Sequence, residues 1–230
     1  MAKWKKSKII TVSTILAIFL AAIVVFLCFV PTIEAEVARR KHYDERVAYF
    51  ELENSMAANA KLVFLGDGIT EQYNLTKYYS LVKSMFNRGI EGDTTTTLQE
   101  RLQVSLLNIK PSVCVLLVGT NNIKSALKNY ESILAEIKEK SPSTKVVVQS
   151  IYPTAGDYAK RNEKIVEVNA EIKVFAEKYG YTYVDIHSVL KDENGELNVA
   201  VAPKRRVTAS TEEPTPARRA TTQYKIISDN

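Results

Sequence analysis

Five short apolar runs alternate with longer amphipathic segments through this chain, and that alternation limits the folds it can adopt. The runs expected to form strands are residues 62–65, 85–90, 113–118, 145–151 and 181–186. The segments expected to form helices are residues 75–83, 95–107, 124–140 and 158–179. Strands that alternate with helices form a parallel sheet sandwiched between helices. The sequence therefore predicts an α/β fold, a three-layer α/β/α sandwich with about five parallel strands.

Two of these segments carry the clearest signals. Residues 113–118, VCVLLV, are apolar throughout, as expected for a strand that is covered on both faces. In residues 130–137, the apolar side chains recur at intervals of three and four, which places them on one face of a helix. In parallel sheets of this kind the ligand site lies at the carboxyl ends of the strands.

Three loops follow the first three expected strands. They are GDGIT at 66–70, GIEGDTTTT at 89–97 and GTNN at 119–122. All three combine glycine with small polar residues, a composition that allows a ligand to approach the backbone closely. The sequence therefore places the candidate site on these loops.

The N-terminal region has the pattern of a membrane anchor. From Ile9 to Val30 the chain has 22 residues without a charge, preceded by four lysines within residues 1–8. A helix of that length spans about 33 Å, which matches the hydrocarbon core of a bilayer. The lysines predict a cytoplasmic tail at 1–8 and an extracytoplasmic location for the rest of the chain. A cleaved signal peptide is the alternative, but its apolar region would be shorter.

The remaining boundaries follow from composition. Residues 31–59 are predicted to form a helical stalk that docks on the domain at 60–198, because 34–58 lack Gly and Pro. Residues 199–230 change character, and two interpretations stay open. One is a disordered or drifted tail. The other is a frameshift across roughly 199–222, because one shifted frame permits a run with histidine, glycine and tyrosine. The gene's nucleotide sequence in this region distinguishes the two.

Charge and cysteine content exclude several classes of function. The net charge of +5 comes from the two ends of the chain, and the body at 32–198 is slightly acidic. No basic stripe with interleaved aromatics is present, so nucleic-acid binding is not expected. Cys28 and Cys114 lie in separate apolar segments and predict no disulfide. The two histidines and two cysteines form no cluster in the sequence, so neither a metal nor a cofactor is expected.

The three loops, taken in order, resemble the signature blocks of the SGNH (GDSL-like) hydrolases, a family of esterases and acylhydrolases with a flavodoxin-like fold. VFLGDGITEQYNL resembles the first block, FNRGIEGDTTTTLQERL the second and LLVGTNNI the third. The resemblance covers roughly residues 60–198. It implies a cleft that binds an ester or an acylated small molecule or glycan.

The resemblance also assigns roles to individual positions. The serine that attacks the ester in this family falls at Gly68, next to Asp67 in a supporting position. Gly92 and Asn121 take the places of the oxyanion-hole glycine and asparagine. Asn122 stands where many members have Asp, as a further supporting residue.

Two parts of the family's machinery are absent from the sequence. Gly68 has no side-chain oxygen, so it cannot attack an ester to form a covalent acyl intermediate. The alternative interpretation is that a tight turn simply favours glycine there. No Asp-x-x-His block occurs after residue 150, and His187 is the single downstream histidine. Its spacing from Asp185 predicts that both side chains lie on one face of a strand end, and His187 is a weak candidate for a base.

Three functional hypotheses follow. The first is a membrane-anchored, outward-facing family member whose ester hydrolysis is impaired or absent. The second is a binding module that holds acyl or glycan ligands in the same cleft without turning them over. The third is an active esterase with rearranged chemistry, in which His187 activates a water in the space beside Gly68.

Overall fold

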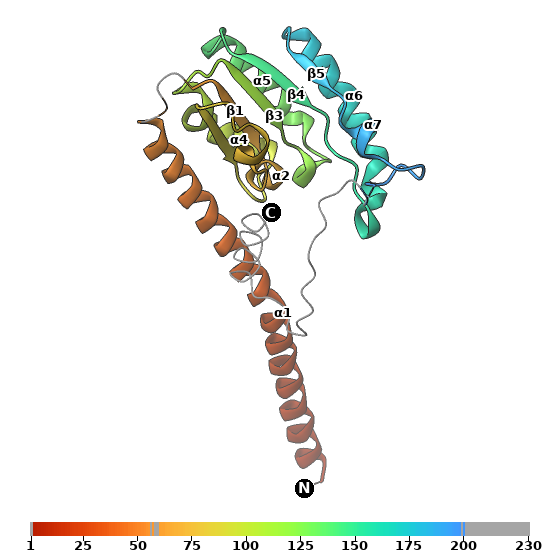
Figure 1. Ribbon diagram of the computed structural model, residues 1–230. Coiled ribbons are helices and arrows are strands. Elements are labelled where there is room, and N and C mark those ends of the chain that lie inside the picture. Colours follow the sequence, from red (N-terminus) through yellow and green to blue (C-terminus); the bar gives the residue numbers. More distant parts are fainter. Residues whose placement is uncertain (1, 56, 58–59, 199, 201–230) are drawn as a thin grey trace. The chain divides into compact units, whose positions relative to one another are not determined.

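The computed structural model describes residues 2–55, 57, 60–198 and 200, and it divides the chain into two compact units (Figure 1). The first unit covers Met1–His42 and the second covers Tyr43–Asn230. Apart from residue 200, the atypical tail predicted at 199–230 lies outside the described residues. The frameshift and disorder interpretations of that tail therefore stay predictions.

The first helix, α1, runs from Ala2 to Asn54 and contains Pro31. It includes the residues predicted as anchor and most of the predicted stalk, but it ends four residues before the predicted end at residue 58. Among the described residues, a search for a helix with the length and hydropathy of a membrane span finds none. The side chains of residues 2–17 are not among those described.

A five-stranded parallel sheet forms the centre of the second unit (Figure 1). The strands are β1 (Leu62–Gly66), β2 (Met85–Gly89), β3 (Val113–Leu117), β4 (Lys145–Gln149) and β5 (Thr182–Val184). Their order is β2-β1-β3-β4-β5, and every neighbouring pair is parallel. This is the flavodoxin-like order. The prediction of a parallel α/β fold with about five strands is confirmed.

The helices of this unit agree less closely with the sequence prediction. They are α2 (Gly68–Glu71), α3 (Leu75–Tyr78), α4 (Thr95–Glu100), η1 (Gln103–Leu107), η2 (Thr120–Asn122), α5 (Leu127–Lys140), η3 (Gly156–Arg161), α6 (Asn162–Lys178) and α7 (His187–Leu190). The helix predicted at 75–83 is wrong beyond Tyr78, because Tyr79 turns to pack its ring against Phe64, with centroids 5.3 Å apart. The helix predicted at 95–107 is interrupted, and its second part is a π-helix.

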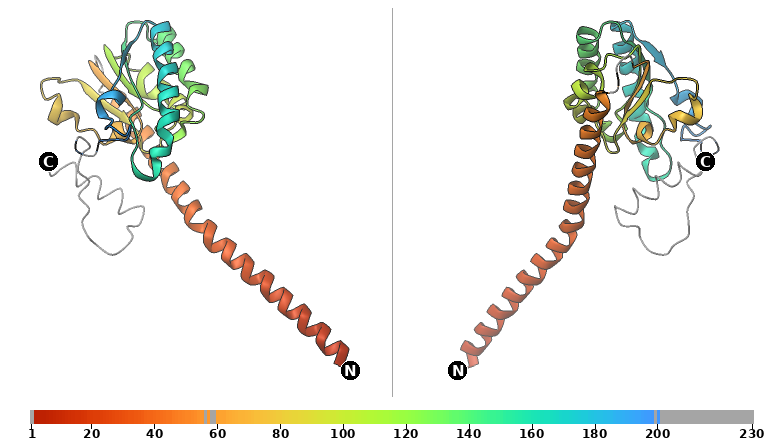
Figure 2. Two further views of the ribbon diagram at one scale, coloured as in Figure 1. Left: turned by 90° about the vertical axis from the view of Figure 1, so that its right-hand side faces the viewer. Right: turned by 60° about the vertical axis from the view of Figure 1, so that its left-hand side comes forward.

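One face of the sheet carries the main hydrophobic core. Alternate residues of the strands point to this face, among them Val63 and Leu65 of β1 and Leu116 of β3. They pack against α4, η1, α5 and α6 through Leu98, Leu102, Leu106, Tyr130, Ile133, Leu134, Ile137, Ile165, Val168 and Ile172. Figure 2 shows α5 and α6 side by side on this face. The apolar face predicted at 130–137 is therefore buried as expected.

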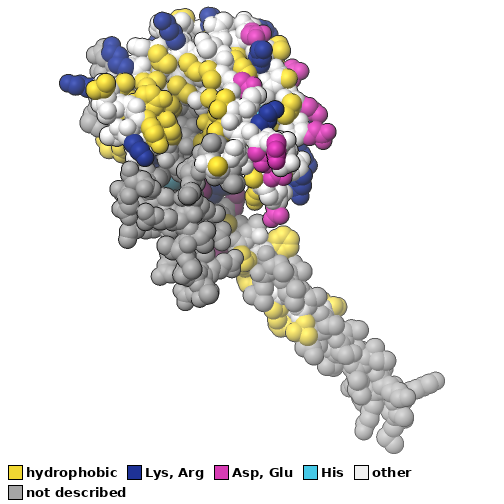
Figure 3. All heavy atoms as spheres, turned by 45° about the vertical axis from the view of Figure 1, so that its right-hand side comes forward, with side chains coloured by type: hydrophobic (Ala, Val, Ile, Leu, Met, Phe, Trp, Pro, Cys, Tyr) yellow, Lys and Arg dark blue, Asp and Glu magenta, His cyan; other side chains and the backbone are white. Residues whose placement is uncertain are grey.

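The opposite face of the sheet has a thinner cover in the described part of the chain. Phe64 of β1 packs against Tyr73 and Tyr79, which flank the short helix α3. Val115 and Val147 on the same face are only partly buried. Figure 3 shows hydrophobic side chains gathered on the surface of this unit, beside atoms that are not described. The second helical layer of the predicted sandwich is thus short where it is described.

The last turns of α1 pack as part of the second unit. Phe50 is fully buried, and its ring lies under the guanidinium groups of Arg46, Arg88 and Arg101, 4.7, 4.6 and 5.6 Å from the ring centroid. Asn54 donates from Nδ2 to the carbonyl of Val104 at 2.8 Å. A planar cation over an aromatic face is stabilising, the more so when water is excluded. The docking predicted for the stalk is therefore present in residues 43–54.

We expect Phe50→Ala to lower the free energy of unfolding by about 3–5 kcal/mol, because it leaves a cavity beneath three arginines. Leu52→Ala is the matched control, since Leu52 lies on the same helix with 66% of its surface exposed. Urea unfolding of the full chain in detergent measures both. Equal effects of the two substitutions would show that the helix end does not pack on the domain.

Candidate active-site cleft

The three loops named by the sequence lie together at the carboxyl ends of β1, β2 and β3. These strands are neighbours in the sheet, with Gly66 level with Gly89 on one side and with Leu117 on the other. Parallel neighbours bring the loops that follow them to the same edge. Direct contacts between the loops, described next, hold this arrangement.

Gly68 begins α2, and Asp67 caps that helix by accepting the amide N–H of Ile69 at Oδ1, 3.0 Å away. A Cβ built on Gly68 would lie 3.3 Å from Cα of Glu91, a tight contact that a shift of a few tenths of an ångström relieves. The backbone of Gly68 is outside the left-handed region. The backbone conformation therefore does not require glycine at this position, and a side chain here needs Glu91 to move by a few tenths of an ångström.

Two neighbouring glycines differ from Gly68 in this respect. A Cβ on Gly66 would lie 2.2 Å from the carbonyl oxygen of Leu117, and one on Gly89 would lie 2.1 Å from the amide nitrogen of Glu71. Both distances are far below van der Waals contact, so β1 and β2 can approach their neighbours only because these residues lack side chains. The close packing of the loops explains Gly66 and Gly89 but not Gly68.

Gly92 and Asn121 face the same region from the second and third loops. Gly92 has a φ of +79°, and within the described part of the chain neither its amide N–H nor that of Gly68 donates a hydrogen bond. Asn121 donates from Nδ2 to the carbonyl of Asp93 at 2.8 Å. An amide side chain has two N–H groups, so a second one remains. Gly68, Gly92 and Asn121 thus lie on the three neighbouring loops with unused N–H groups among the described residues, and their roles around an anion stay a prediction.

Asn122 links the third loop to α4. Its Nδ2 donates to the hydroxyl of Thr95 at 2.9 Å, and its Oδ1 accepts the amide N–H of Thr95 at 3.3 Å. Both groups of the side-chain amide are used, and the donated bond is one that an ionised Asp could not make. The side-chain amide of Asn122 therefore supports the third loop by bonding to Thr95.

A buried ion pair connects the second loop to the end of β1. Arg101 lies 2.6 Å from Asp93, and both side chains are fully buried. Arg101 also donates to the carbonyl of Gly66 at 3.0 Å, and Thr97 donates to Asp93 at 2.7 Å. The sequence did not predict this ion pair. In the sequence the pair is visible only as an Asp and an Arg eight residues apart, and exposed charges often have the same spacing.

Arg46 of α1 is a second residue that the sequence did not single out. Its Nε lies 3.3 Å from Glu71, and its Nη2 donates to the carbonyl of Gly89 at 3.1 Å. Glu71 in turn accepts the amide N–H of Glu91 at 2.5 Å. The docked end of α1 therefore supports the first and second loops directly.

Asp67 is an unusual carboxyl group because it is 1% exposed and only partly hydrogen-bonded. Its Oδ2 has no hydrogen-bond partner among the described residues. Burial, and secondarily the nearby charge of Asp93, raises the pKa of Asp67 to about 6, against the opposing hydrogen bond from the amide N–H of Ile69. The supporting position predicted for Asp67 is thus a buried acid that titrates well above its ordinary range.

His187 and Asp185 lie elsewhere, and the prediction that they share a strand end is wrong. β5 stops at Val184, and His187 begins α7 because its amide N–H donates to Ser150 Oγ at 2.7 Å while Asp185 caps the turn through Ser188. His187 is buried, with 6% of its surface exposed. Burial lowers its pKa, and neighbouring Asp185 opposes that shift.

His187 lines a cavity against α6, and Gly68, Gly92 and Asn121 do not line it. Within the described residues, no hydrogen bond joins His187 to those three positions. The structure does not bring the weak candidate base to the cleft. In the part of the chain that is described, no group of three His, Cys, Asp or Glu side chains could hold a metal ion.

Comparison with known proteins agrees with this geometry. A parallel sheet in the flavodoxin-like order, with the three motif loops at one edge, defines an α/β protein of the SGNH type. The family model described as the GDSL-like Lipase/Acylhydrolase family matches residues 64–205. The chain belongs to this family.

Individual curated relatives share about a third of their residues with this chain over the aligned region. The human platelet-activating factor acetylhydrolase IB subunit alpha2 is 32% identical over 124 residues, which are 49% of this chain and 53% of that protein. A Drosophila melanogaster homolog of the beta subunit is 32% identical over 119 residues, 47% of this chain and 52% of that protein. The chain thus spans about half the length of the curated relatives it matches.

Solved structures extend the likeness. A Streptococcus pneumonia protein named for platelet activating factor has a TM-score of 0.64 and 25% identity, covering 84% of this chain and 94% of that one. A GDSL-like lipase from Bacteroides thetaiotaomicron has a TM-score of 0.57 and 23% identity, covering 80% and 93%. The second of these shows the fold alone.

The raised pKa of Asp67 predicts a specific pH dependence of stability. Between its ordinary value of 3.8 and about 6, the folded state keeps a proton that the unfolded state has released. The free energy of unfolding should therefore fall as pH rises through this window, by about 3 kcal/mol, and not change further above it. Asp67→Asn removes this titration, so its stability relative to wild type should rise by that amount from pH 4 to pH 7. Urea unfolding at each pH measures the difference; parallel curves would contradict the assignment.

Proposed function

We propose that this chain is a membrane-anchored, extracytoplasmic member of the GDSL-like esterase family whose ester hydrolysis is impaired or absent. The observation that carries the proposal is Gly68, which stands in the nucleophile's place in a turn that does not need glycine. Steric demand therefore does not account for the residue, and the loss of a serine does.

The chemical consequence follows from the missing oxygen. Without a hydroxyl at residue 68, no acyl-enzyme can form. Removal of a nucleophile from a hydrolytic triad costs a factor on the order of 10⁴ to 10⁶ in rate. Oxyanion donors alone retain roughly 10³ over water. The uncommitted amides of Gly68 and Gly92, with Asn121, form such a set of donors.

The general base is missing as well. The sequence has no Asp-x-x-His after residue 150, and His187 lines a different cavity. This separation argues against an esterase in which His187 activates a water beside Gly68. Two losses in one cleft support impaired hydrolysis more strongly than either one does.

A second function is supported by the same donors. A cleft with two unused backbone N–H groups and a side-chain amide can bind the carbonyl or carboxylate of an acyl or glycan ligand without cleaving it. The related acetylhydrolase subunits are named for platelet-activating factor, and the broader class, an ester or acylated small molecule, is what we propose for this chain.

The hydrolysis proposal predicts that the full chain in detergent cleaves a short-chain nitrophenyl ester at least about 10⁴-fold more slowly than an active esterase does. Gly68→Ser should fold but remain inactive, because no base reaches the new hydroxyl. A spectrophotometric assay of both proteins measures this. Normal turnover by wild type would refute the proposal, and activity in Gly68→Ser would show that a base is present.

The thermal unfolding temperature of the wild-type chain, measured with and without acylated sugars, tests whether these ligands bind. Stabilisation that Asn121→Ala diminishes would support the binding module, and flat curves across a broad panel would contradict it.

The anchor is the second part of the proposal. The 22 uncharged residues from Ile9 to Val30 lie within the helix α1, and lysines precede them. That length and charge pattern supports a single span with residues 1–8 in the cytoplasm and the domain outside.

We expect the full chain to stay with membranes after an alkaline carbonate wash, and the domain to be digested when protease is added to intact cells. Lysines at both Val24 and Val25 should release it, since each costs about 2.5–3.5 kcal/mol at the centre of a span. Val37→Lys, at a position 62% exposed in the stalk, is the control and should remain bound. Release of wild type by the wash, or a protected domain, would overturn the anchor or its orientation.

A further inference from the structure

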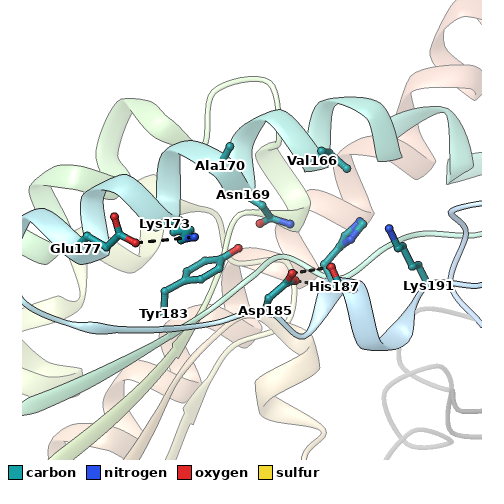
Figure 4. A pocket seen from close by; sticks show the side chains of 10 residues that line it. Val166, Asn169, Ala170, Lys173, Glu177, Tyr183, Asp185, His187 and Lys191 are labelled. Atoms are coloured by element: carbon teal, nitrogen blue, oxygen red, sulfur yellow. Dashed lines mark hydrogen bonds and ion pairs between the residues drawn. The ribbon is translucent and has the colours of Figure 1, made fainter.

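A cavity lies apart from the three motif loops, between α6 and the segment from β5 to α7. Its volume is about 510 Å³, and α6 lines one side with Val166, Asn169 and Lys173. Tyr183, His187 and Lys191 line the other side (Figure 4). This volume falls in the range of small-molecule sites. None of the three motif loops contributes to it.

His187 is the buried polar group of this cavity. The residue is 6% exposed, and its Nε2 has no hydrogen-bond partner among the described residues. Its backbone is held by the bond to Ser150 Oγ, and Figure 4 shows the imidazole directed from α7 towards α6. An unpartnered buried nitrogen is costly unless something binds it.

The charged groups around His187 leave one cation uncommitted. Asp185 accepts the hydroxyl of Ser188 at 2.6 Å and its amide N–H at 3.0 Å. Glu177 lies 4.0 Å from Lys173. Lys191 makes no ion pair or side-chain hydrogen bond with the residues that the structure describes. The unused groups are therefore an ammonium and an imidazole, next to an apolar wall formed by Val166 and Ala170.

We propose that this cavity binds a small organic carboxylate. The acid group lies between Lys191 Nζ and His187 Nε2, and the hydrocarbon part lies against Val166 and Ala170. Lys191, which has no ion pair among the described residues, and the His187 ring together match a singly charged carboxylate and fall short of what a phosphate dianion requires. The apolar wall selects an organic acid over an inorganic anion. This site does not depend on whether the cleft hydrolyses esters.

The two histidines of the chain make the site easy to observe. In isotope-labelled full chain in detergent, the ring resonances of His42 and His187 form two sets, which His42→Gln assigns. Hexanoate should shift the His187 set saturably and leave the His42 set unchanged. Lys191→Gln should weaken the apparent affinity about tenfold, the usual effect of losing a charge-assisted hydrogen bond.

Control variants and ligands make each outcome decisive. Lys164→Gln, at an exposed position of α6 paired with Glu167, should bind hexanoate like wild type. The absence of a saturable shift at His187, or equal binding by Lys191→Gln, would overturn the proposal. Equal shifts with hexanol would show that the cavity recognises only the apolar chain, and equal shifts with inorganic phosphate would show that it recognises any anion; either result would contradict a carboxylate site.

Discussion

Asp93 is the residue on which the arrangement of the three loops depends. Its carboxylate pairs with Arg101, which also donates to the carbonyl of Gly66 at the end of β1. Its own carbonyl accepts the side chain of Asn121 from the third loop. A single residue of the second loop therefore fixes the other two. Breaking one side of a fully buried ion pair costs about 3–5 kcal/mol, because the remaining charge stays buried without compensation.

Burial is the main cause of the raised pKa of Asp67, and the nearby charge of Asp93 adds to it. Two carboxyl groups, Asp67 and Asp93, are buried near each other, and Arg101 pairs with Asp93. Asp67 has no cation of its own among the described contacts, so it keeps its proton up to about pH 6. Burial raises the pKa of both carboxyl groups, and Arg101 opposes that shift at Asp93. This electrostatic framework is intact although the residue it would support at position 68 has no functional group.

The glycines of the loops differ in whether the packing of the backbone requires them. Gly66 and Gly89 permit backbone contacts that no side chain would allow, whereas Gly68 has room for a Cβ after a small adjustment. A serine in that place would serve the reaction and not the packing. The fold can therefore persist with glycine at this position, because the contacts that Gly66 and Gly89 permit hold the backbone of the loops in place.

The sequence predicted the sheet and the three loops because apolar runs and glycine motifs are local signals. The register of β1 with its neighbours then follows from burial. Other features could not be predicted in this way. Arg46 and Glu71 are 25 positions apart, and only the packing of α1 brings them together. The helix after Leu75 stops early because Tyr79 finds a partner in Phe64, a tertiary contact that overrides local helix preference.

His187 shows why a residue's chemistry cannot be assigned from its sequence neighbours alone. The spacing from Asp185 suggested a strand end, but β5 stops earlier and Ser150 captures the His187 amide at the start of α7. With this bond in place, the imidazole points towards α6 and lines a cavity to which Gly68, Gly92 and Asn121 do not contribute. The histidine that remains after residue 150 is therefore committed to a different cavity. The bond to Ser150 thus places in this cavity an imidazole whose Nε2 has no hydrogen-bond partner among the described residues.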